Sequence, residues 1–194
     1  MKKVKKFVIG TLAALMLFGG LSIPSNAMEQ NNSDESDIII VEVVVNQLGP
    51  EYIENILLDD GTRIGDHDFI VIEERGRIGA RSQPQVIHIH NAIRALNSNF
   101  DFVGWITRGG VVSISLDPVQ AVRSNNRARA NTAWDALRNP LAGISTDSRW
   151  RNESALRAQY FCHWEIARNK SRWNLEPHRT ATSAIVNAAF LCNP

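Results

Sequence analysis

The sequence predicts an α+β protein: a β-rich N-terminal half with a β-hairpin near residues 102–116, followed by a small, disulfide-closed helical module. Three observations predict this class. Runs of β-branched residues separated by glycine turns occupy the first half. Apolar residues at helical spacing follow after residue 150. Both cysteines of the 194-residue chain lie in that last part. An apolar share of 44% and a charged share of 21% are typical of globular proteins.

The first residues have the three parts of a secretory signal peptide. Four lysines between residues 2 and 6 precede an apolar run over residues 7–20, and Ser25-Asn26-Ala27 forms a small-residue cleavage site. The apolar run is too short for a good membrane span. We therefore expect residues 1–27 to be removed by cleavage near Ala27 and the mature protein to be secreted. Residues 28–37 are polar and acidic, and we expect them to be disordered.

Residues 38–126 are predicted to form a β-rich pro-region or N-terminal domain. The β-branched run over residues 38–45 and the run over 67–74 predict strands, and apolar spacing over 51–58 predicts a short helix between them. Residues 86–90 fit either a strand or the start of a helix, and the pattern does not separate the two.

The hairpin at 102–116 is the clearest local prediction. Two β-rich runs flank Gly109-Gly110, a pair that favours a tight primed turn. Trp105 and Ile114 are then candidates for a covered face.

Residues 127–194 are predicted to form a basic helical module. The Arg-rich residues 119–133 fit a partial helix or a linker, and Thr132 has the spacing of a helix start. Asn152 is a candidate N-cap for an amphipathic helix that runs through Arg168. Residues 173–179 should be extended because of Pro177.

The two cysteines are predicted to form a disulfide. Thr180 or Thr182 is the expected cap of a final helix, which would place Cys192 on its apolar stripe, while Cys162 lies beside the stripe of the preceding helix. In an oxidising compartment two such cysteines pair. Closing a loop of this length would stabilise the fold by about 3–4 kcal/mol. The alternative is a free catalytic thiol, which is hard to maintain outside the cell.

Charge is distributed unevenly along the chain. Residues 28–100 hold 13 acidic and 5 basic side chains, whereas residues 128–194 hold 5 acidic and 9 basic ones. One interpretation is an acidic pro-region that masks a cationic effector until an extracellular protease cuts near Arg127, Ala128, Arg129 and Ala130. The other is two faces of one permanent domain.

No catalytic residue, metal site or cofactor is predicted. His88 and His90 would share one face of a strand, and Asp66-His67-Asp68 could add ligands, but neither group has a third ligand at diagnostic spacing. His163 and Glu176 could form an acid–base couple, but a structural histidine is the favoured interpretation. The sequence holds no phosphate loop, zinc signature or nucleic-acid fold signature, so we expect no nucleic-acid partner.

Aromatic and arginine side chains gather between residues 160 and 179. They fit an amphipathic face that meets an anionic membrane or a cell-envelope surface, or equally a small core with guanidinium groups stacked on its rim. The candidate binding residues are His163, Trp164, Trp173, Asn174, Glu176 and Arg179.

Several short blocks in the last half of the chain form a pattern. They are Trp105…Arg108, Ser115-Leu116-x-Pro118, Trp134-Asp135-x-Leu137, Gln159-Tyr160-x-Cys162-His163, Trp173-Asn174-Leu175-Glu176-Pro177-x-Arg179 and Cys192-Asn193-Pro194. These blocks resemble a family of secreted bacterial proteins that is known mainly as a domain of unknown function and includes an enterocin of the EntV type. The resemblance covers about residues 105–194. It implies a secreted, mostly helical module closed by a disulfide, which in at least one relative is released by proteolysis as an antimicrobial peptide, and it implies no catalytic residues. Thr180 departs from the proline expected there.

Three functions are consistent with these sequence features. The first is a bacteriocin-like precursor whose basic C-terminal part acts on competing microbes, with or without proteolytic release. The alternative is a secreted, non-enzymatic module that binds the envelope as one intact domain. The third is a secreted hydrolase that uses His163 and Glu176. We expect the protein not to be an enzyme.

Overall fold

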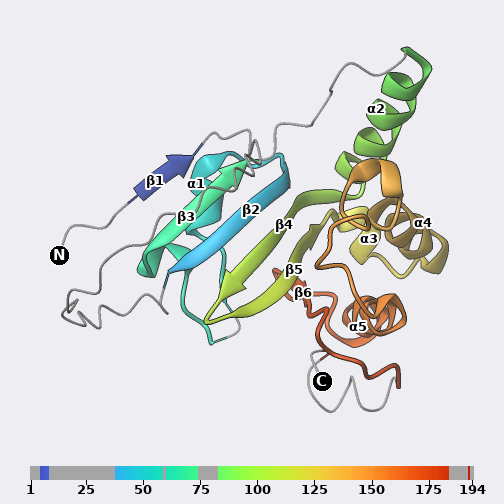
Figure 1. The fold of residues 1–194 in the computed structure, drawn as a ribbon. Coiled ribbons are helices and arrows are strands. Elements are labelled where there is room, and N and C mark those ends of the chain that lie inside the picture. The colour runs from blue at the N-terminus through green and yellow to red at the C-terminus, as the bar shows by residue number, and fades with distance from the viewer. Residues whose placement is uncertain (1–4, 9–37, 59, 74–82, 184–191, 193–194) are drawn as a thin grey trace, which may run out of the picture.

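A computed structural model describes residues 5–8, 38–58, 60–73, 83–183 and 192. The predicted α+β class is confirmed: strands form one mixed sheet in the order β1-β3-β2-β4-β5-β6, and helices gather mainly on one side of it (Figure 1). The predicted disordered segment 28–37 lies outside the described residues.

The N-terminal half supplies the parallel part of the sheet. Strand β2 (Ile39–Asn46) pairs in parallel with β3 (Phe69–Glu73), which pairs in parallel with β1 (Lys5–Val8). Strand β1 lies within the predicted signal peptide, so cleavage near Ala27 would remove it and leave β3 as the edge strand. Both predicted strands, near 38–45 and 67–74, are confirmed. Parallel neighbours require a crossover connection. It contains α1 (Pro50–Glu54), shorter than the predicted helix, and the 3₁₀ turn η2 (Ile64–Asp66), and we call residues 47–68 the crossover segment.

The predicted hairpin is confirmed. Strands β4 (Phe100–Arg108) and β5 (Val111–Pro118) pair antiparallel, and β4 also pairs antiparallel with β2. Gly109 and Gly110 have φ of 53° and 77°, which a primed two-residue turn requires and glycine adopts without strain. Trp105 and Ile114 face each other in register and are 3% and 0% exposed.

Besides α1, four helices are described: one lies between β3 and β4, and three follow β5. They are α2 (Gln83–Asn97), α3 (Gln120–Arg123), α4 (Arg127–Leu137) and α5 (Glu153–Ile166), with a 3₁₀ turn η3 (Pro140–Ala142). Residues 86–90 are therefore helical, which settles the open alternative. Helix α4 begins earlier than predicted, because the Asn126 side chain accepts a hydrogen bond from the Arg129 N–H, so Thr132 lies inside the helix.

The extended segment near Pro177 contains a strand that the sequence did not reveal. Strand β6 (Trp173–Leu175) pairs antiparallel with β5 and becomes the last strand of the sheet. The segments before and after the predicted boundary at residues 126 and 127 thus both contribute strands to one sheet. Residues 180–183 are not helical, and the rest of the predicted final helix, up to Cys192, lies outside the described residues.

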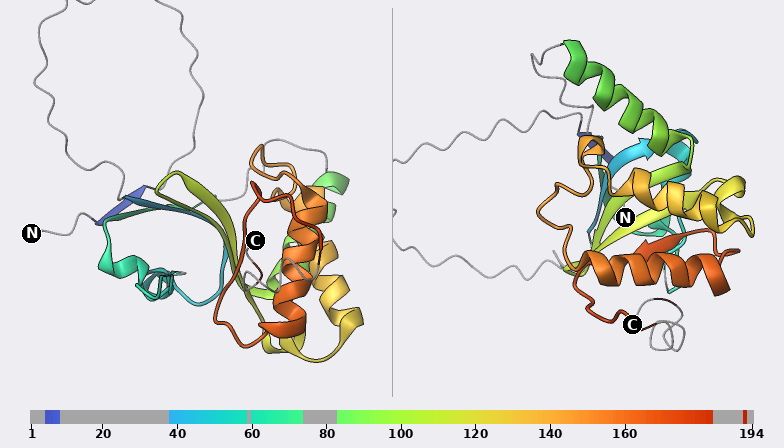
Figure 2. Two further views of the ribbon diagram at one scale, coloured as in Figure 1. Left: turned by 90° about the horizontal axis from the view of Figure 1, so that it is seen from below. Right: turned by 90° about the vertical axis from the view of Figure 1, so that its right-hand side faces the viewer.

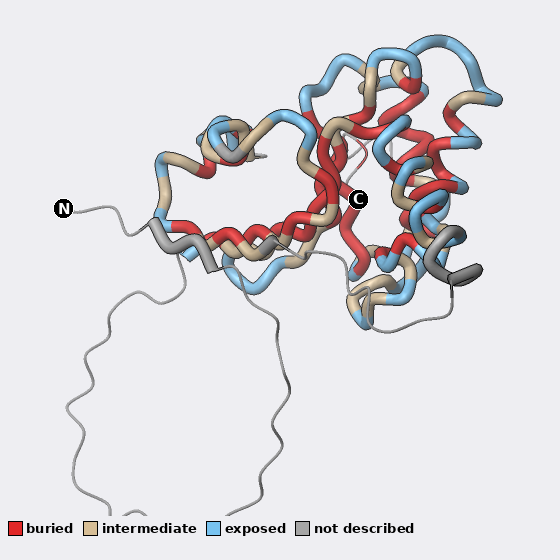
Figure 3. Tube along the Cα trace, turned by 90° about the horizontal axis from the view of Figure 1, so that it is seen from above, coloured by how far each residue is buried: buried red, intermediate tan, exposed pale blue. Residues whose placement is uncertain are grey.

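Two apolar clusters lie on opposite sides of the sheet. Figure 2 shows the sheet from two further sides, and Figure 3 colours its buried residues red. We call the side that carries α2, α4 and α5 the helical face; its cluster includes Trp105, Trp134, Tyr160 and Trp173. We call the opposite side the crossover face, where the crossover segment packs and where Phe102 lies. Side chains alternate between these faces along each strand. Among the described residues, no helix is both long enough and apolar enough to span a membrane.

Candidate functional site

The predicted disulfide is confirmed. Cys162, in the middle of α5, is bonded to Cys192, 30 residues later, with the two Cα atoms 5.4 Å apart. Both cysteines are buried, at 7% and 0% exposure. The bond therefore fixes the end of the chain against the helix that carries the Gln-x-x-Cys-His block.

Helix α5 also binds the backbone of β6. Gln159 Nε2 donates to the Glu176 carbonyl at 3.2 Å, and its Oε1 accepts from the Glu176 N–H at 2.7 Å. One helical turn later, the His163 Nε2 lies 3.3 Å from the Asn174 carbonyl oxygen. Residues four apart rise about 6 Å along a helix and residues two apart span about 7 Å of a strand. The distance between Gln159 and His163 along the helix therefore matches the distance between Glu176 and Asn174 along the extended segment.

The contact with the Asn174 carbonyl places His163 between α5 and the extended segment, as a residue that joins the two. Its ring also stacks on Trp173, with 6.0 Å between centroids and 8° between planes. The Glu176 carboxylate is held elsewhere, by Arg179 Nε at 2.6 Å and by His178 at 3.6 Å. No contact in the described part of the chain joins the His163 ring to that carboxylate, so the structure does not bring the proposed acid–base couple together.

A stack of alternating arginine and aromatic side chains covers the outer side of α5. Arg157 and Arg127 lie 4.5 Å and 4.1 Å from the Phe161 ring centroid, and Arg127 and Arg168 both lie 5.2 Å from that of Trp164. We call these five residues the arginine ladder. Its rings are only 5% and 6% exposed, whereas Arg127 and Arg157 are exposed. Cations favour the faces of aromatic rings, so the stack presents guanidinium groups to solvent over buried rings.

One acidic side chain contacts the ladder through an ion pair. Glu165 Oε1 lies 2.6 Å from Arg127 Nη1, and both side chains are about half exposed. Arg157 has no ion pair within the described residues, and Arg168 bonds only neutral groups, the Asn125 side chain and the Glu165 carbonyl. The ladder therefore has a net positive charge.

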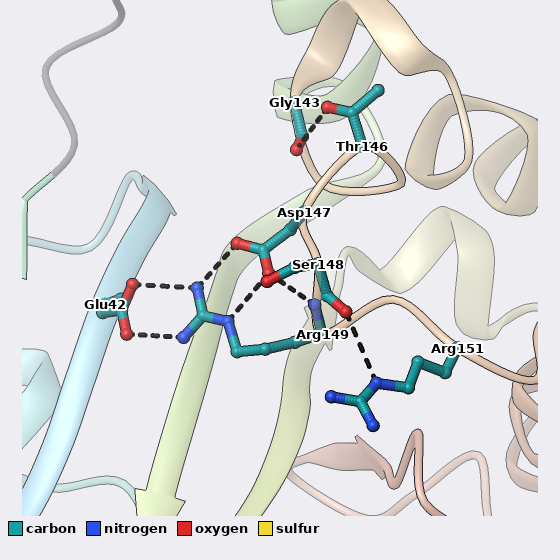
Figure 4. A network of polar contacts seen from close by, with 7 residues as sticks. All are labelled: Glu42, Gly143, Thr146, Asp147, Ser148, Arg149 and Arg151. Atoms are coloured by element: carbon teal, nitrogen blue, oxygen red, sulfur yellow. Dashed lines mark hydrogen bonds and ion pairs between the residues drawn. The ribbon is translucent and has the colours of Figure 1, made fainter.

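Arg149 joins the loop before α5 to the N-terminal part of the sheet (Figure 4). Its two Nη atoms reach both carboxylate oxygens of Glu42 on β2, and its Nη2 and Nε reach Asp147 at 2.7 and 2.9 Å. The guanidinium lies 4.6 Å from the Trp105 centroid. Hydrogen bonds to Asp147, and then to Glu42, raise the pKa of Arg149, and the hydrogen bond with Arg149 lowers the pKa of Asp147.

Arg172 lies on the crossover face rather than beside Trp164. It is 6% exposed and stacks between Phe102 and Tyr52, 4.3 and 4.6 Å from their centroids. Burial lowers its pKa, while the nearby Tyr52 and Asp117 act in the opposite direction. Tyr52 in turn donates a hydrogen bond to Asp117. The crossover segment is thereby attached to β5 and β6.

The remaining predicted sites are placed as follows. His88 and His90 lie exposed on α2, and the described residues contain no cluster of three metal-ligating side chains. The candidate processing residues Arg127–Ala130 form the first turn of α4. Ala130 is fully buried, and its carbonyl accepts a hydrogen bond from the Tyr160 hydroxyl at 3.1 Å.

The region from β4 to the end of the chain matches a known family. Residues 100–194 match the family described as protein of unknown function (DUF2599). This match confirms the predicted resemblance to a domain of unknown function and begins close to its predicted start; it names no enterocin. It contains the whole arginine ladder, the disulfide and Arg149, but not Glu42.

Curated relatives match over a similar length. Uncharacterized proteins of Mycobacterium bovis and Mycobacterium tuberculosis are 31% identical to the chain over 98 residues. The aligned part is 48% of this chain and 64% of each relative, so the chain spans less than two thirds of these relatives. No solved structure matches the chain.

Sequence reasoning assigned Arg127 only to a processing site and missed Arg149 and Arg157. Arg157 could have been found, because Arg157, Phe161, Trp164 and Arg168 recur at the three- and four-residue spacing of one helix face. Arg127 contacts Phe161, 34 residues later, and Arg149 binds Glu42, 107 residues earlier, and no local pattern marks such contacts.

Proposed function

We propose that this protein is exported and acts as one intact, non-enzymatic binding module at the cell envelope, where the arginine ladder binds a linear anionic polymer. The signal-peptide pattern and the disulfide support export, because disulfides persist in oxidising compartments. The observation that carries the proposal is the ladder itself. It holds three guanidinium groups over rings that fix their positions, with one acidic partner.

A polymer fits the ladder better than a bilayer does. Helices that enter a membrane interface bury apolar side chains in it. Here Phe161 and Trp164 lie beneath the guanidinium groups, and Ile166, at 61% exposure, is the one large apolar side chain that α5 exposes. Guanidinium groups bind phosphate through paired hydrogen bonds. A polymer that carries phosphate groups can therefore bind the guanidinium groups of the ladder.

Two contacts support an intact module. Strand β6, which lies in the C-terminal part, pairs with β5, and Arg149 binds Glu42 of β2. Cutting at Arg127–Ala130 and removing the tail would break both. Limited proteolysis of the protein recovered from culture medium tests this point: a chain that resists cutting between residues 123 and 133 supports the module, and rapid release of a tail contradicts it.

Binding is tested with inorganic polyphosphate as the polymer probe, at 50 and 300 mM salt. The double variant Arg157→Gln/Arg168→Gln should bind about tenfold more weakly, and the difference should shrink at high salt because the Debye length falls. The control Arg94→Gln/Arg138→Gln removes the same charge elsewhere. Equal weakening by both double variants would show that binding depends on the total positive charge and not on the ladder. Binding to phosphatidylglycerol vesicles but not to polyphosphate would favour a membrane.

A released antimicrobial tail is the second candidate. The Cys162–Cys192 bond supports it, because both cysteines lie within residues 127–194 and a released fragment would keep the bond. Purified, oxidised residues 130–194 applied to sensitive cells test this candidate. Growth arrest at micromolar dose would support it, and the absence of any effect on growth or morphology would remove it.

A further inference from the structure

The Trp-Asn-Leu-Glu block divides its side chains between the two faces of the sheet. Trp173 and Leu175 are fully buried in the cluster under the helices. Asn174 and Glu176 point to the opposite side, because neighbouring residues of a strand alternate. Packing under the helices therefore explains Trp173 and Leu175. Asn174 and Glu176 instead line a cleft on the crossover face.

This cleft has a volume of about 210 Å³ and is open to solvent. One wall is the crossover segment and the other is formed by β4, β5 and the end of β6. An ion pair between Arg108 and Asp60, at 2.6 Å, joins the crossover segment to β4 near the hairpin turn. The residues that line the cleft are Leu57, Leu58, Ile106, Arg108, Val111, Ser113, Asn174 and Glu176.

The chemistry of the lining is mainly aliphatic, with a small number of polar groups. Four of its side chains are aliphatic, and two of these, Leu57 and Val111, are among the most exposed large apolar residues, at 44% and 49%. Ser113 and Asn174 add a neutral hydroxyl and a neutral amide. Ligand sites commonly combine an apolar lining with a small number of placed polar groups.

The two charged residues of the lining are already paired. Arg108 binds Asp60, and Glu176 binds Arg179 through Oε2. A charged ligand would have to lose its hydration without gaining an unpaired partner, which disfavours it. The lining thus selects an uncharged ligand that has an aliphatic part together with hydrogen-bonding groups of the amide type.

We propose that the cleft binds an uncharged segment of a short peptide with an aliphatic side chain. The side chain lies against Leu57 and Ile106, and the peptide amide bonds to Ser113 and Asn174. This activity is separate from polymer binding by the ladder, which lies across the sheet.

The test is a titration of the isotope-labelled full chain, as exported, with the blocked dipeptide N-acetyl-leucyl-alanine amide, followed by NMR. We expect saturable shifts at the amides of Ser113 and Asn174, with a dissociation constant on the order of 0.1–1 mM for a ligand of this size. Leu57→Asp should weaken binding at least tenfold, and Val111→Asp should do the same. The control Leu48→Asp changes a side chain of similar exposure, 42%, outside the cleft.

Three results would overturn the proposal. They are no saturable shift with the dipeptide, equal weakening by Leu48→Asp, and saturable shifts with N-acetylglucosamine alone, which would make the cleft a sugar site. Arg157→Gln/Arg168→Gln should leave dipeptide binding unchanged. Failure of polymer binding and failure of peptide binding are therefore distinguishable.

Discussion

Replacing Arg149 by glutamine should show whether the two halves of the chain are held as one unit. The change removes the guanidinium that lies between Glu42, Asp147 and the Trp105 ring. Arg149, Glu42 and Asp147 are each 24% exposed, so the pairs are largely shielded from solvent. Without Arg149, the Glu42 and Asp147 carboxylates face each other with no cation between them.

The expected loss of stability follows from these contacts. A hydrogen bond to a charged group contributes about 1.5–3 kcal/mol, and a partly desolvated cation–π contact about 0.5–2 kcal/mol. Glutamine keeps one donor, so we expect a net loss of about 2–4 kcal/mol. For a domain of this size that corresponds to a fall in Tm of roughly 5–10 °C.

Urea unfolding of the wild type, Arg149→Gln, Glu42→Gln and the double variant measures the effect and the coupling. The coupling free energy between the two sites should exceed about 1 kcal/mol, because contacting charged partners are not additive. Arg151→Gln, two residues away and exposed, is the matched control and should change stability by less than about 0.5 kcal/mol. A loss no larger than that of the control, or additive single effects, would refute the reasoning.

Three further predictions concern stability. Reducing the Cys162–Cys192 bond, or replacing both cysteines by serine, should lower the free energy of unfolding by about 3–4 kcal/mol, and equal urea midpoints with and without reductant would contradict this. Gln159→Leu leaves the buried Glu176 N–H and carbonyl without their partner and should cost about 2–4 kcal/mol; a neutral effect in thermal unfolding would show that the backbone contact is dispensable. Asp147→Asn should flatten the pH dependence of stability in acid. The hydrogen bond with Arg149 lowers the pKa of Asp147, so its contribution is present above the unfolded pKa of about 4 and is lost as pH falls through the folded value. The difference between wild type and variant should therefore be constant from about pH 7 to pH 5 and shrink as the pH falls below about 4, and urea midpoints that stay parallel through acid would contradict this.

Local chemistry explains which elements could be predicted. The hairpin was predictable because Gly109-Gly110 can adopt positive φ between two runs of β-branched residues. The disulfide was predictable from the signal-peptide pattern and from the scarcity of cysteine. Strand β6 was not, because its three residues are too few for alternation to mark a strand. It exists through pairing with β5 and through side chains of α5, contacts that no window of sequence contains.

Distant contacts also explain why the candidate site was only half predicted. Asn152 does begin α5, but its φ is 51° and its side chain donates to the Pro177 carbonyl instead of capping the helix. Asn174 and Glu176 were singled out from their motif, yet the cleft that they line needs Leu57, which lies more than 100 residues earlier. Arg149 and Glu42 are 107 positions apart. Such pairs follow from topology, which sequence periodicity does not give.

The attachment of α5 to β6 has a consequence for how copies of this protein behave when they meet. The last strand of a sheet normally offers a row of free amides and carbonyls, and another polypeptide can extend the sheet there. Gln159 and His163 occupy that row at residues 174 and 176. This margin of the sheet is thus closed to intermolecular strand addition.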